Sequence, residues 1–317
     1  MIDILTIGDV GIDIYYLLDP NDACVRHIGK DREHELCFDL SEKIPVDEIH
    51  STVGGNAANV AIGTSRLGLV TSILTEVGND EDGRKIIHTL EKEDVNLDNI
   101  TRGNITNQTI ALVYKGQRTL LVHHQPRKYL FTNPKPARWI YLTSTNIGGD
   151  AIIDDIVKFA NDNNSKIAFS PGTIQIKSGP HKYNPIIEIC DLIVMNKQEA
   201  QQYLNNDSDN IELLLSKLQE LGPGFSVITD GINGSYGFDG DENYKCKSVD
   251  VKTLDNTGAG DAYSAALVTA LAKGENLREA MKWGSVNSAS VVQFVGPQKG
   301  LLSLPKLQDQ VLKNFKI

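Results

Sequence analysis

The chain has 317 residues, of which 40% are hydrophobic and 23% charged, so it is long and apolar enough for one large core or two smaller ones. Its formal net charge of −10 disfavours nucleic acid as the main partner, because phosphate binding requires clustered lysines and arginines. The longest apolar stretches have strand length, so no membrane helix is expected, and the four cysteines lack metal-ligand spacing, which favours reduced thiols in a cytoplasmic protein.

Apolar runs of strand length alternate with segments of helical period along most of the chain. The first run, 2–9, is interpreted as a core strand and not as a signal peptide. Further strands are expected at 70–77, 139–143, 167–170, 192–195 and 225–229, and helices at 57–67, 82–93, 151–161, 211–221, 258–273 and 277–294. This alternation predicts an α/β fold with a mainly parallel sheet covered on both faces, which binds ligands at the carboxyl ends of its strands.

Two regions break the alternation. The first holds strand-like pieces at 14–18 and 35–38, and the second resembles two strands joined by a turn at 115–118. We expect a small separate sheet that forms a lid; the alternative is that these strands extend the main sheet. The prediction is therefore one domain over 1–317, with lid strands from about 14–49 and 106–123.

The segment Asp255-Asn256-Thr257-Gly258-Ala259-Gly260-Asp261 carries the strongest chemical signal. Its small residues Gly258, Ala259 and Gly260 allow another molecule close to the backbone, at a helix start where free N–H groups attract anions. Asp261 lies in the first helical turn, where its carboxylate is expected to stay ionised and to accept a proton from a hydroxyl. This arrangement suits phosphoryl transfer, although the string alone is more often an ordinary tight turn.

Two earlier segments offer groups that suit a sugar-like ligand. Gly54 and Gly55 lead into an Ala-rich helix, on which the Asn59 amide could both donate to and accept from a hydroxyl. Asp13 follows the first strand and could accept hydrogen bonds from two neighbouring hydroxyls. Alone, these residues are as typical of a helix cap and of a loop aspartate that bonds its own backbone.

Two later strand ends could serve a nucleotide. Asn196 and Glu199 share one helix face and could hold Mg²⁺ through water, but Asn-x-x-Glu is also typical of a capping box. The loop with Thr229, Gly231 and Gly234 could pass under a nucleotide, and alone it is typical of a hairpin turn. Neither GxxxxGK[ST] nor GxGxxG after the first strand is present, which disfavours a P-loop enzyme and a dinucleotide fold.

In this order, the segments resemble the ribokinase-like family of carbohydrate and nucleoside kinases, also called the phosphofructokinase-B family. The likeness spans roughly 4–304 and rests on 54–59, similar to the N-terminal signature of the family, and on 255–261, similar to its C-terminal signature. It implies a three-layer α/β/α sandwich with a small β lid, and transfer of the γ-phosphoryl group of ATP with Mg²⁺. The lid often mediates dimerisation in this family.

The resemblance also assigns roles by position. Asp261 would be the catalytic base, with Gly258, Ala259 and Gly260 as the anion hole. The implied acceptor-binding residues are Asp13, Gly54, Gly55, Asn59 and Thr143, and the implied nucleotide-binding residues are Asn196, Thr229, Gly231, Gly234 and Asn287. Asn196 and Glu199 would organise Mg²⁺ and phosphate, and Asp255 and Thr257 match positions that bind a monovalent cation such as K⁺ in some members.

The leading hypothesis for the acceptor is an unphosphorylated sugar. Asn56 stands where the phosphosugar and ribose enzymes tend to have Lys, which disfavours a phosphorylated acceptor, although Arg118, Arg127 and Lys43 could reach a phosphate from the lid.

Three alternatives remain open. The first is a nucleoside kinase of the adenosine, guanosine, inosine or cytidine type, in which Tyr16, Phe38 or His123 would stack on the base. The others are a sugar-phosphate kinase and a catalytically inactive sugar-binding regulator.

Overall fold

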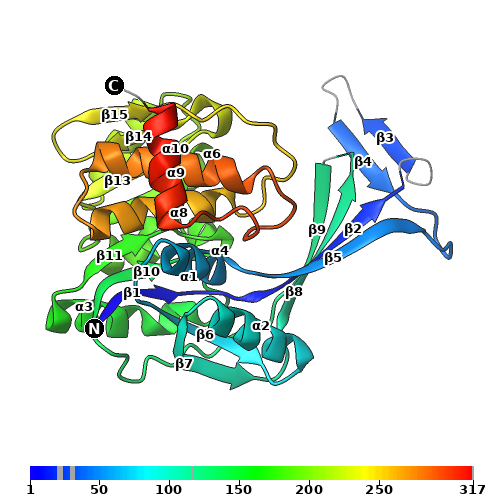
Figure 1. Ribbon diagram of the computed structural model, residues 1–317, viewed down its shortest axis with the longest axis horizontal. Helices are drawn as coiled ribbons and strands as arrows, with labels where there is room; N and C mark the ends of the chain where they lie inside the picture. Colours follow the sequence, from blue (N-terminus) through cyan, green and yellow to red (C-terminus); the bar gives the residue numbers. More distant parts are fainter. Residues whose placement is uncertain (20–23, 29–32, 116, 316–317) are drawn as a thin grey trace.

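A nine-stranded sheet forms the centre of the protein, seen in a computed structural model that describes residues 1–19, 24–28, 33–115 and 117–315 (Figure 1). Its order is β15-β14-β13-β12-β11-β10-β1-β6-β7. The seven strands from β13 to β7 are parallel, and β14 and β15 continue the sheet antiparallel. The bounds are β1 Ile2–Ile7, β6 Thr71–Gly78, β7 Asn96–Gly103, β10 Ala137–Leu142, β11 Lys166–Phe169, β12 Leu192–Asn196, β13 Phe225–Thr229, β14 Ser235–Phe238 and β15 Asn243–Cys246.

Helices cover both faces of this sheet, as the alternating pattern predicted. One face packs against α3 to α7, and the other against α1, α2, α8, α9 and α10, each through a layer of buried aliphatic side chains. The bounds are α1 Asn56–Arg66, α2 Glu81–Lys92, α3 Ile153–Asn163, α4 Thr173–Ser178, α5 Asn184–Ile187, α6 Lys197–Leu204, α7 Ile211–Gln219, α8 Ala259–Ala272, α9 Leu277–Val291 and α10 Leu304–Asn314, with 3-10 turns η1 Gly149–Ile152, η2 Pro180–Tyr183 and η3 Gly231–Asn233. None of the described helices is long and apolar enough to cross a membrane.

The lid is a separate sheet of four strands, which confirms the expected second sheet. Its order is β5-β2-β8-β9, with β2 at Gly11–Leu18, β5 at Val46–Gly54, β8 at Asn107–Tyr114 and β9 at Gln117–His123. A two-stranded sheet of β3 Cys24–Ile28 and β4 Glu33–Cys37 accompanies it. Of the predicted turn at 115–118, residue 116 lies outside the described residues. Only residues 8–10 separate β1 from β2, so one nearly continuous segment runs from the core into the lid.

Some elements escaped the sequence pattern for identifiable reasons. Strand β7 is an edge strand rich in polar residues, including Asn96, Asp98 and Asn99, so it lacks the apolar run of a buried strand. Helix α10 buries only Leu307 and Val311, which is too few apolar positions for a clear helical period. These omissions lie at the rim of the fold and leave the predicted centre unchanged.

Candidate active site

Two cavities meet at the start of α8. The first, called here the lid cavity, measures about 350 Å³ and lies between the lid and the main body; the second, the strand-end cavity, measures about 890 Å³. The lid cavity is lined by residues that include Asp9, Asp13, Tyr15, Gly55, Asn56, Asn59, Asn107, Arg118, His124, Ser144, Thr257, Gly258 and Asp261. The strand-end cavity is lined by residues that include Asn196, Thr229, Gly231, Gly234, Asn256, Ala259, Gly260, Ser288 and Val292. The segment 258–261 therefore faces both spaces.

Two side-chain amides hold Asp261 in place. Asn56 Nδ2 donates to Asp261 Oδ1 at 2.9 Å, and Asn59 Nδ2 donates to Oδ2 at 2.8 Å. Gln298 in turn donates to Asn59 Oδ1 at 2.9 Å, which fixes the orientation of that amide. The carboxylate is thus oriented on both oxygens while it still borders the lid cavity.

Burial raises the pKa of Asp261 to about 7, against the lowering effect of the two amide hydrogen bonds; the charges of Glu199 and Asp13 raise it further. The expectation that the helix start keeps this carboxylate ionised therefore needs correction. Near neutral pH the group exchanges a proton readily, which suits a general base.

The backbone at the start of α8 is open on the side of the strand-end cavity. Gly258 has φ 75°, and a Cβ there would lie 2.4 Å from Pro297 Cβ, so only glycine fits. A Cβ added at Gly260 would meet no described atom within 4 Å. No described side chain caps this helix, so its first-turn N–H groups are available to an anion.

The predicted acceptor-binding residues fall into two sets. Asp13, Gly55 and Asn59 line the lid cavity. Gly54 makes room, because a Cβ there would lie 2.1 Å from Asp13 Oδ2. Thr143 is 1% exposed and does not line the cavity, whose described lining includes its neighbour Ser144 instead.

The pKa of Asp13 is raised to about 6. Burial is the main cause and the charge of Asp255 adds to it, while the guanidinium of Arg118 acts in the opposite direction.

Four of the five predicted nucleotide-binding residues line the strand-end cavity: Asn196, Thr229, Gly231 and Gly234. Asn287 does not. It is fully buried, donates to Ala262 O at 2.8 Å and accepts from Leu302 N at 3.1 Å. The Asn287 side chain therefore links α9 to α8 by a hydrogen bond and lies outside the cavity.

Asn196 and Glu199 form a capping box at the start of α6. Asn196 Oδ1 accepts from Glu199 N, and Glu199 Oε2 accepts from Asn196 N, both at 2.8 Å. Burial raises the pKa of Glu199. In the described part of the chain, no three Asp, Glu, His or Cys side chains are grouped to hold a metal ion. These residues fit a Mg²⁺ that arrives with nucleotide phosphates and keeps its waters, rather than a metal in a protein cage.

Asp255 is surrounded by donors from its own loop and from the lid. Its Oδ1 accepts from Thr257 N at 2.9 Å and from Thr257 Oγ1 at 2.6 Å, and its Oδ2 accepts from Gly296 N at 2.9 Å. Arg118 of β9 adds an ion pair at 3.0 Å. A guanidinium thus already stands at the predicted monovalent-cation position.

The structure also brings in residues to which the sequence assigned no role. Asp9 and Asn107 line the lid cavity, and so do Tyr15 and His124. Asp9 follows β1 directly, as strand-end ligands do in parallel sheets, which is the signal that could have identified it.

Aromatic rings to stack on a base and cationic side chains to bind a phosphate were proposed from the sequence, and of these only Arg118 is among the described residues that line the lid cavity. Among the described lining residues of the lid cavity, Tyr16, Phe38, His123, Arg127 and Lys43 are not found.

Comparisons with known proteins identify the family to which this chain is similar. Residues 22–304 match the family described as pfkB family carbohydrate kinase. A 5-dehydro-2-deoxygluconokinase of Listeria innocua is 25% identical over 284 residues, covering 81% of this chain and 87% of that protein. A nucleoside kinase of Methanothermobacter thermautotrophicus is 26% identical over 257 residues, covering 78% and 81%.

Solved structures show the same fold. The ribokinase of Arabidopsis thaliana, complexed with ribose and ATP, superposes with a TM-score of 0.81 at 18% identity and 98% coverage of both chains. An E. coli structure in complex with ATP and Mg²⁺ gives a TM-score of 0.78 at 17% identity, covering 99% of this chain and all of that one.

Proposed function

Because this chain belongs to the pfkB family of carbohydrate kinases, we propose that it transfers the γ-phosphoryl group of ATP to a hydroxyl of an unphosphorylated sugar. The observation that carries the proposal is the position of Asp261, held by two amides beside an open helix start at the junction of two cavities. One cavity suits the acceptor and the other suits the nucleotide.

In this mechanism, Asp261 accepts the proton of the attacking hydroxyl, which lies in the lid cavity. The backbone N–H groups at the start of α8 stabilise negative charge on the transferred group, which passes the open side of Gly260. Mg²⁺, when bound with ATP, supplies positive charge that offsets the charge of the phosphates. Asn196 lines the nucleotide side, with Glu199 fixing its amide from behind.

The charges around the lid cavity favour a neutral acceptor. Its lining contains the carboxylates of Asp9, Asp13 and Asp261, while the guanidinium of Arg118 already pairs with Asp255. A phosphate on the acceptor would face these carboxylates without a free cation among the described lining residues. This arrangement supports an unphosphorylated sugar over a sugar phosphate.

A nucleoside is the second candidate acceptor, and one observation favours it. The ring of His124 is exposed and lines the lid cavity, where it could stack on a base. Tyr15 lines the same cavity but is only 2% exposed, so it offers little ring surface.

The test is a Mg·ATP kinase assay against sugars, nucleosides and sugar phosphates. Turnover on nucleosides with none on free sugars would exclude the sugar proposal. Asp261→Asn should lower kcat at least about 100-fold and leave acceptor binding nearly intact. Asp162→Asn, exposed on α3 and distant in sequence from every lining residue, is the control. Acceptor binding without turnover in the wild type would instead indicate an inactive regulator.

We also propose that the lid forms a homodimer contact. Its edge strand β9 exposes Leu120, Leu121 and Val122, an apolar stretch that a second copy could cover. Light scattering of the wild type and of Leu121→Lys tests this contact, and a monomeric wild type would refute it.

A further inference from the structure

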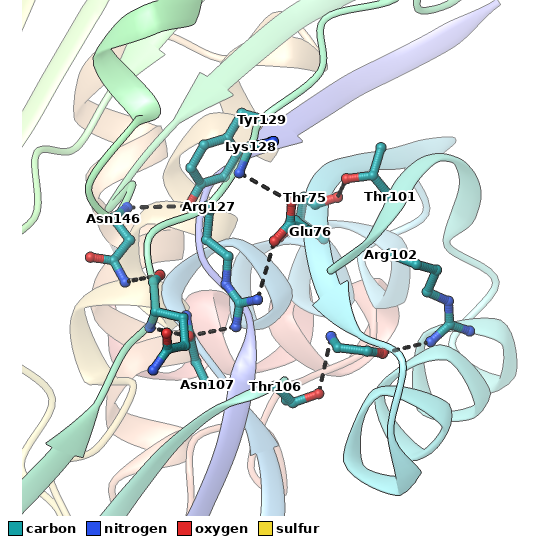
Figure 2. Close-up of polar contacts among 12 residues, drawn as sticks. Thr75, Glu76, Thr101, Arg102, Thr106, Asn107, Arg127, Lys128, Tyr129 and Asn146 are labelled. Carbon is teal, nitrogen blue, oxygen red and sulfur yellow. Dashed lines mark hydrogen bonds and ion pairs between the residues drawn. The ribbon is translucent and has the colours of Figure 1, made fainter. Parts of the chain in front are cut away.

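A buried polar network includes two residues that line the lid cavity. Figure 2 shows the contacts of this network around Arg127. We call it the Arg127 network; it comprises Asp9, Glu76, Asn107, Arg127 and Tyr129. The side chain of Arg127 is only 2% exposed, forms an ion pair with Glu76 Oε1 at 3.3 Å and donates to Asn107 Oδ1 at 2.5 Å. A guanidinium buried this deeply fixes its partners, because loss of the Glu76 contact would leave buried charges unpaired and loss of the Asn107 contact would leave a buried N–H without an acceptor.

Tyr129 fixes Asp9, the acidic member of the network that lines the cavity. Its hydroxyl donates to Asp9 Oδ1, while the Tyr129 oxygen accepts from Asn146 N at 3.1 Å. The Asp9 carboxyl group is 7% exposed, and burial raises its pKa to about 6 although Tyr129 and Arg127 lower it. A buried carboxylate kept at a cavity wall is an acceptor for a ligand hydroxyl.

Asn107 presents a donor that the described protein does not satisfy. Its Oδ1 accepts from Arg127 Nη2 and from Gln125 N at 3.0 Å, so these two donors identify the oxygen branch of the amide. The Nδ2 branch points away from them, is buried and has no hydrogen-bond partner among the described residues. Asn107 lines the cavity and is 2% exposed, so its buried Nδ2 is a donor at the cavity wall that has no partner among the described residues.

We propose that Asp9 and Asn107 form a subsite for the acceptor, in which Asp9 accepts from a hydroxyl and Asn107 Nδ2 donates to an oxygen of a neutral polyhydroxylated compound. These groups bind positions other than the hydroxyl that Asp261 deprotonates. The inference rests on the proposed function, because it specifies the acceptor of that site. Tyr129 is a positioning residue that acts through Asp9. The acceptor on Asp9 and the donor on Asn107 together match a diol, or a hydroxyl beside an oxo group, on the ligand.

The sharpest variant is Asn107→Asp. It keeps the oxygen that accepts from Arg127 and Gln125, and it replaces the unpaired donor with an acceptor that carries negative charge beside Arg127. Asp9→Asn is the complementary change, and Tyr129→Phe removes only the hydroxyl that orients Asp9. Tyr203→Phe is the matched control, because the Tyr203 hydroxyl is also buried but has no partner among the described residues.

Binding is measured by calorimetry without ATP, on the full-length protein. The neutral probes are D-ribose, D-fructose, D-glucose and myo-inositol, and the anionic probes are D-gluconate and D-fructose 6-phosphate. We expect the tightest wild-type binder to be neutral. Its Kd should rise at least about tenfold in Asn107→Asp and in Asp9→Asn, and should be unchanged in Tyr203→Phe. In kinetics, Tyr129→Phe should raise KM for the acceptor and leave kcat and KM for ATP unchanged.

The outcomes separate the subsite from the kinase proposal. Weakened binding in both variants without any phosphoryl transfer supports the subsite and refutes the kinase. Transfer with unchanged binding in both folded variants refutes the subsite and supports the kinase. Tighter wild-type binding of an anionic probe, or no binding of any neutral probe, also overturns the subsite. If Asn107→Asp fails to fold, as judged by circular dichroism, Asp9→Asn decides the result alone.

Discussion

Replacing the proposed base with its amide should make the protein more stable in alkaline conditions. The pKa of Asp261 rises from its ordinary value of 3.8 to about 7 on folding, so between these values the native state binds a proton that the unfolded state does not. The free energy of unfolding of the wild type therefore falls as pH rises through this window, and Asp261→Asn removes that loss. Function at this site is accordingly expected to cost stability.

The magnitude follows from the same pKa. Between pH 5 and pH 8, only the two pH units from 5 to about 7 contribute, because above its pKa the carboxylate is ionised in both states. At 1.36 kcal/mol per unit, the free energy of unfolding of Asp261→Asn relative to the wild type should grow by about 3 kcal/mol. The asparagine can accept from only one of Asn56 and Asn59 and opposes the other donor. This mismatch does not depend on pH, so the difference between the two pH values isolates the titration.

Urea unfolding of both proteins at pH 5 and pH 8 measures this difference, with Asp162→Asn as the exposed control. A stability difference between variant and wild type that stays constant within about 0.5 kcal/mol would refute the raised pKa of Asp261.

Three further predictions concern catalysis. Because the base must be deprotonated, kcat/KM should be about tenfold lower at pH 6 than on its alkaline plateau, and a flat profile from pH 6 to 8 would contradict a base with a pKa of about 7. Gly260→Ala should keep the wild-type Tm, because its methyl group meets no described atom, and should lower kcat at least about 10-fold, because the methyl group enters the path of the phosphoryl group. Gly63→Ala is the contrasting variant: its Cβ would lie 2.7 Å from Ala265 Cβ, so it should lower the free energy of unfolding by about 1–3 kcal/mol. Replacing K⁺ by tetramethylammonium should change the activity of the wild type less than about threefold, because the Arg118 guanidinium already supplies positive charge at Asp255. The activity of Arg118→Met should change more, because that variant lacks this charge. Equal sensitivity of both proteins would exclude this role for Arg118.

The parts of the site that sequence could predict are those made by backbone at the ends of regular elements. Gly258 precedes and Gly260 lies in the first turn of a helix whose apolar residues are unmistakable, so the open helix start followed from residue type and position alone. Asp13 could also be placed near the site, because it follows the first strand across a short break, although it contributes a side chain from lid strand β2.

The parts that sequence could not predict depend on tertiary partners. The pKa of Asp261 is set by burial and by amides about 200 positions away, which no local pattern encodes. Asn287 and Thr143 carry no signal of their burial, so the family resemblance assigned them ligand contacts where the structure shows internal packing. Asn107 was missed because its significance depends on its contact with Arg127, whose side chain was expected to reach a phosphate from the lid.

Because β1 continues almost without a break into β2, the lid is attached to the main body as an arm that extends from residues 8–10. Strand β2 has eight residues, which at 3.3 Å each is a lever arm of roughly 26 Å, and residues 8–10 anchor it to β1, an interior strand of the main sheet. Asp9 occupies this pivot and Asp13 lies near the fixed end. A rotation of about 10° at the pivot displaces the tip by roughly 4–5 Å over that arm. A ligand bound at Asp9 would therefore act beside the pivot, where a small displacement gives the largest movement of the tip, and a probe at Leu18 should report such a movement on acceptor binding.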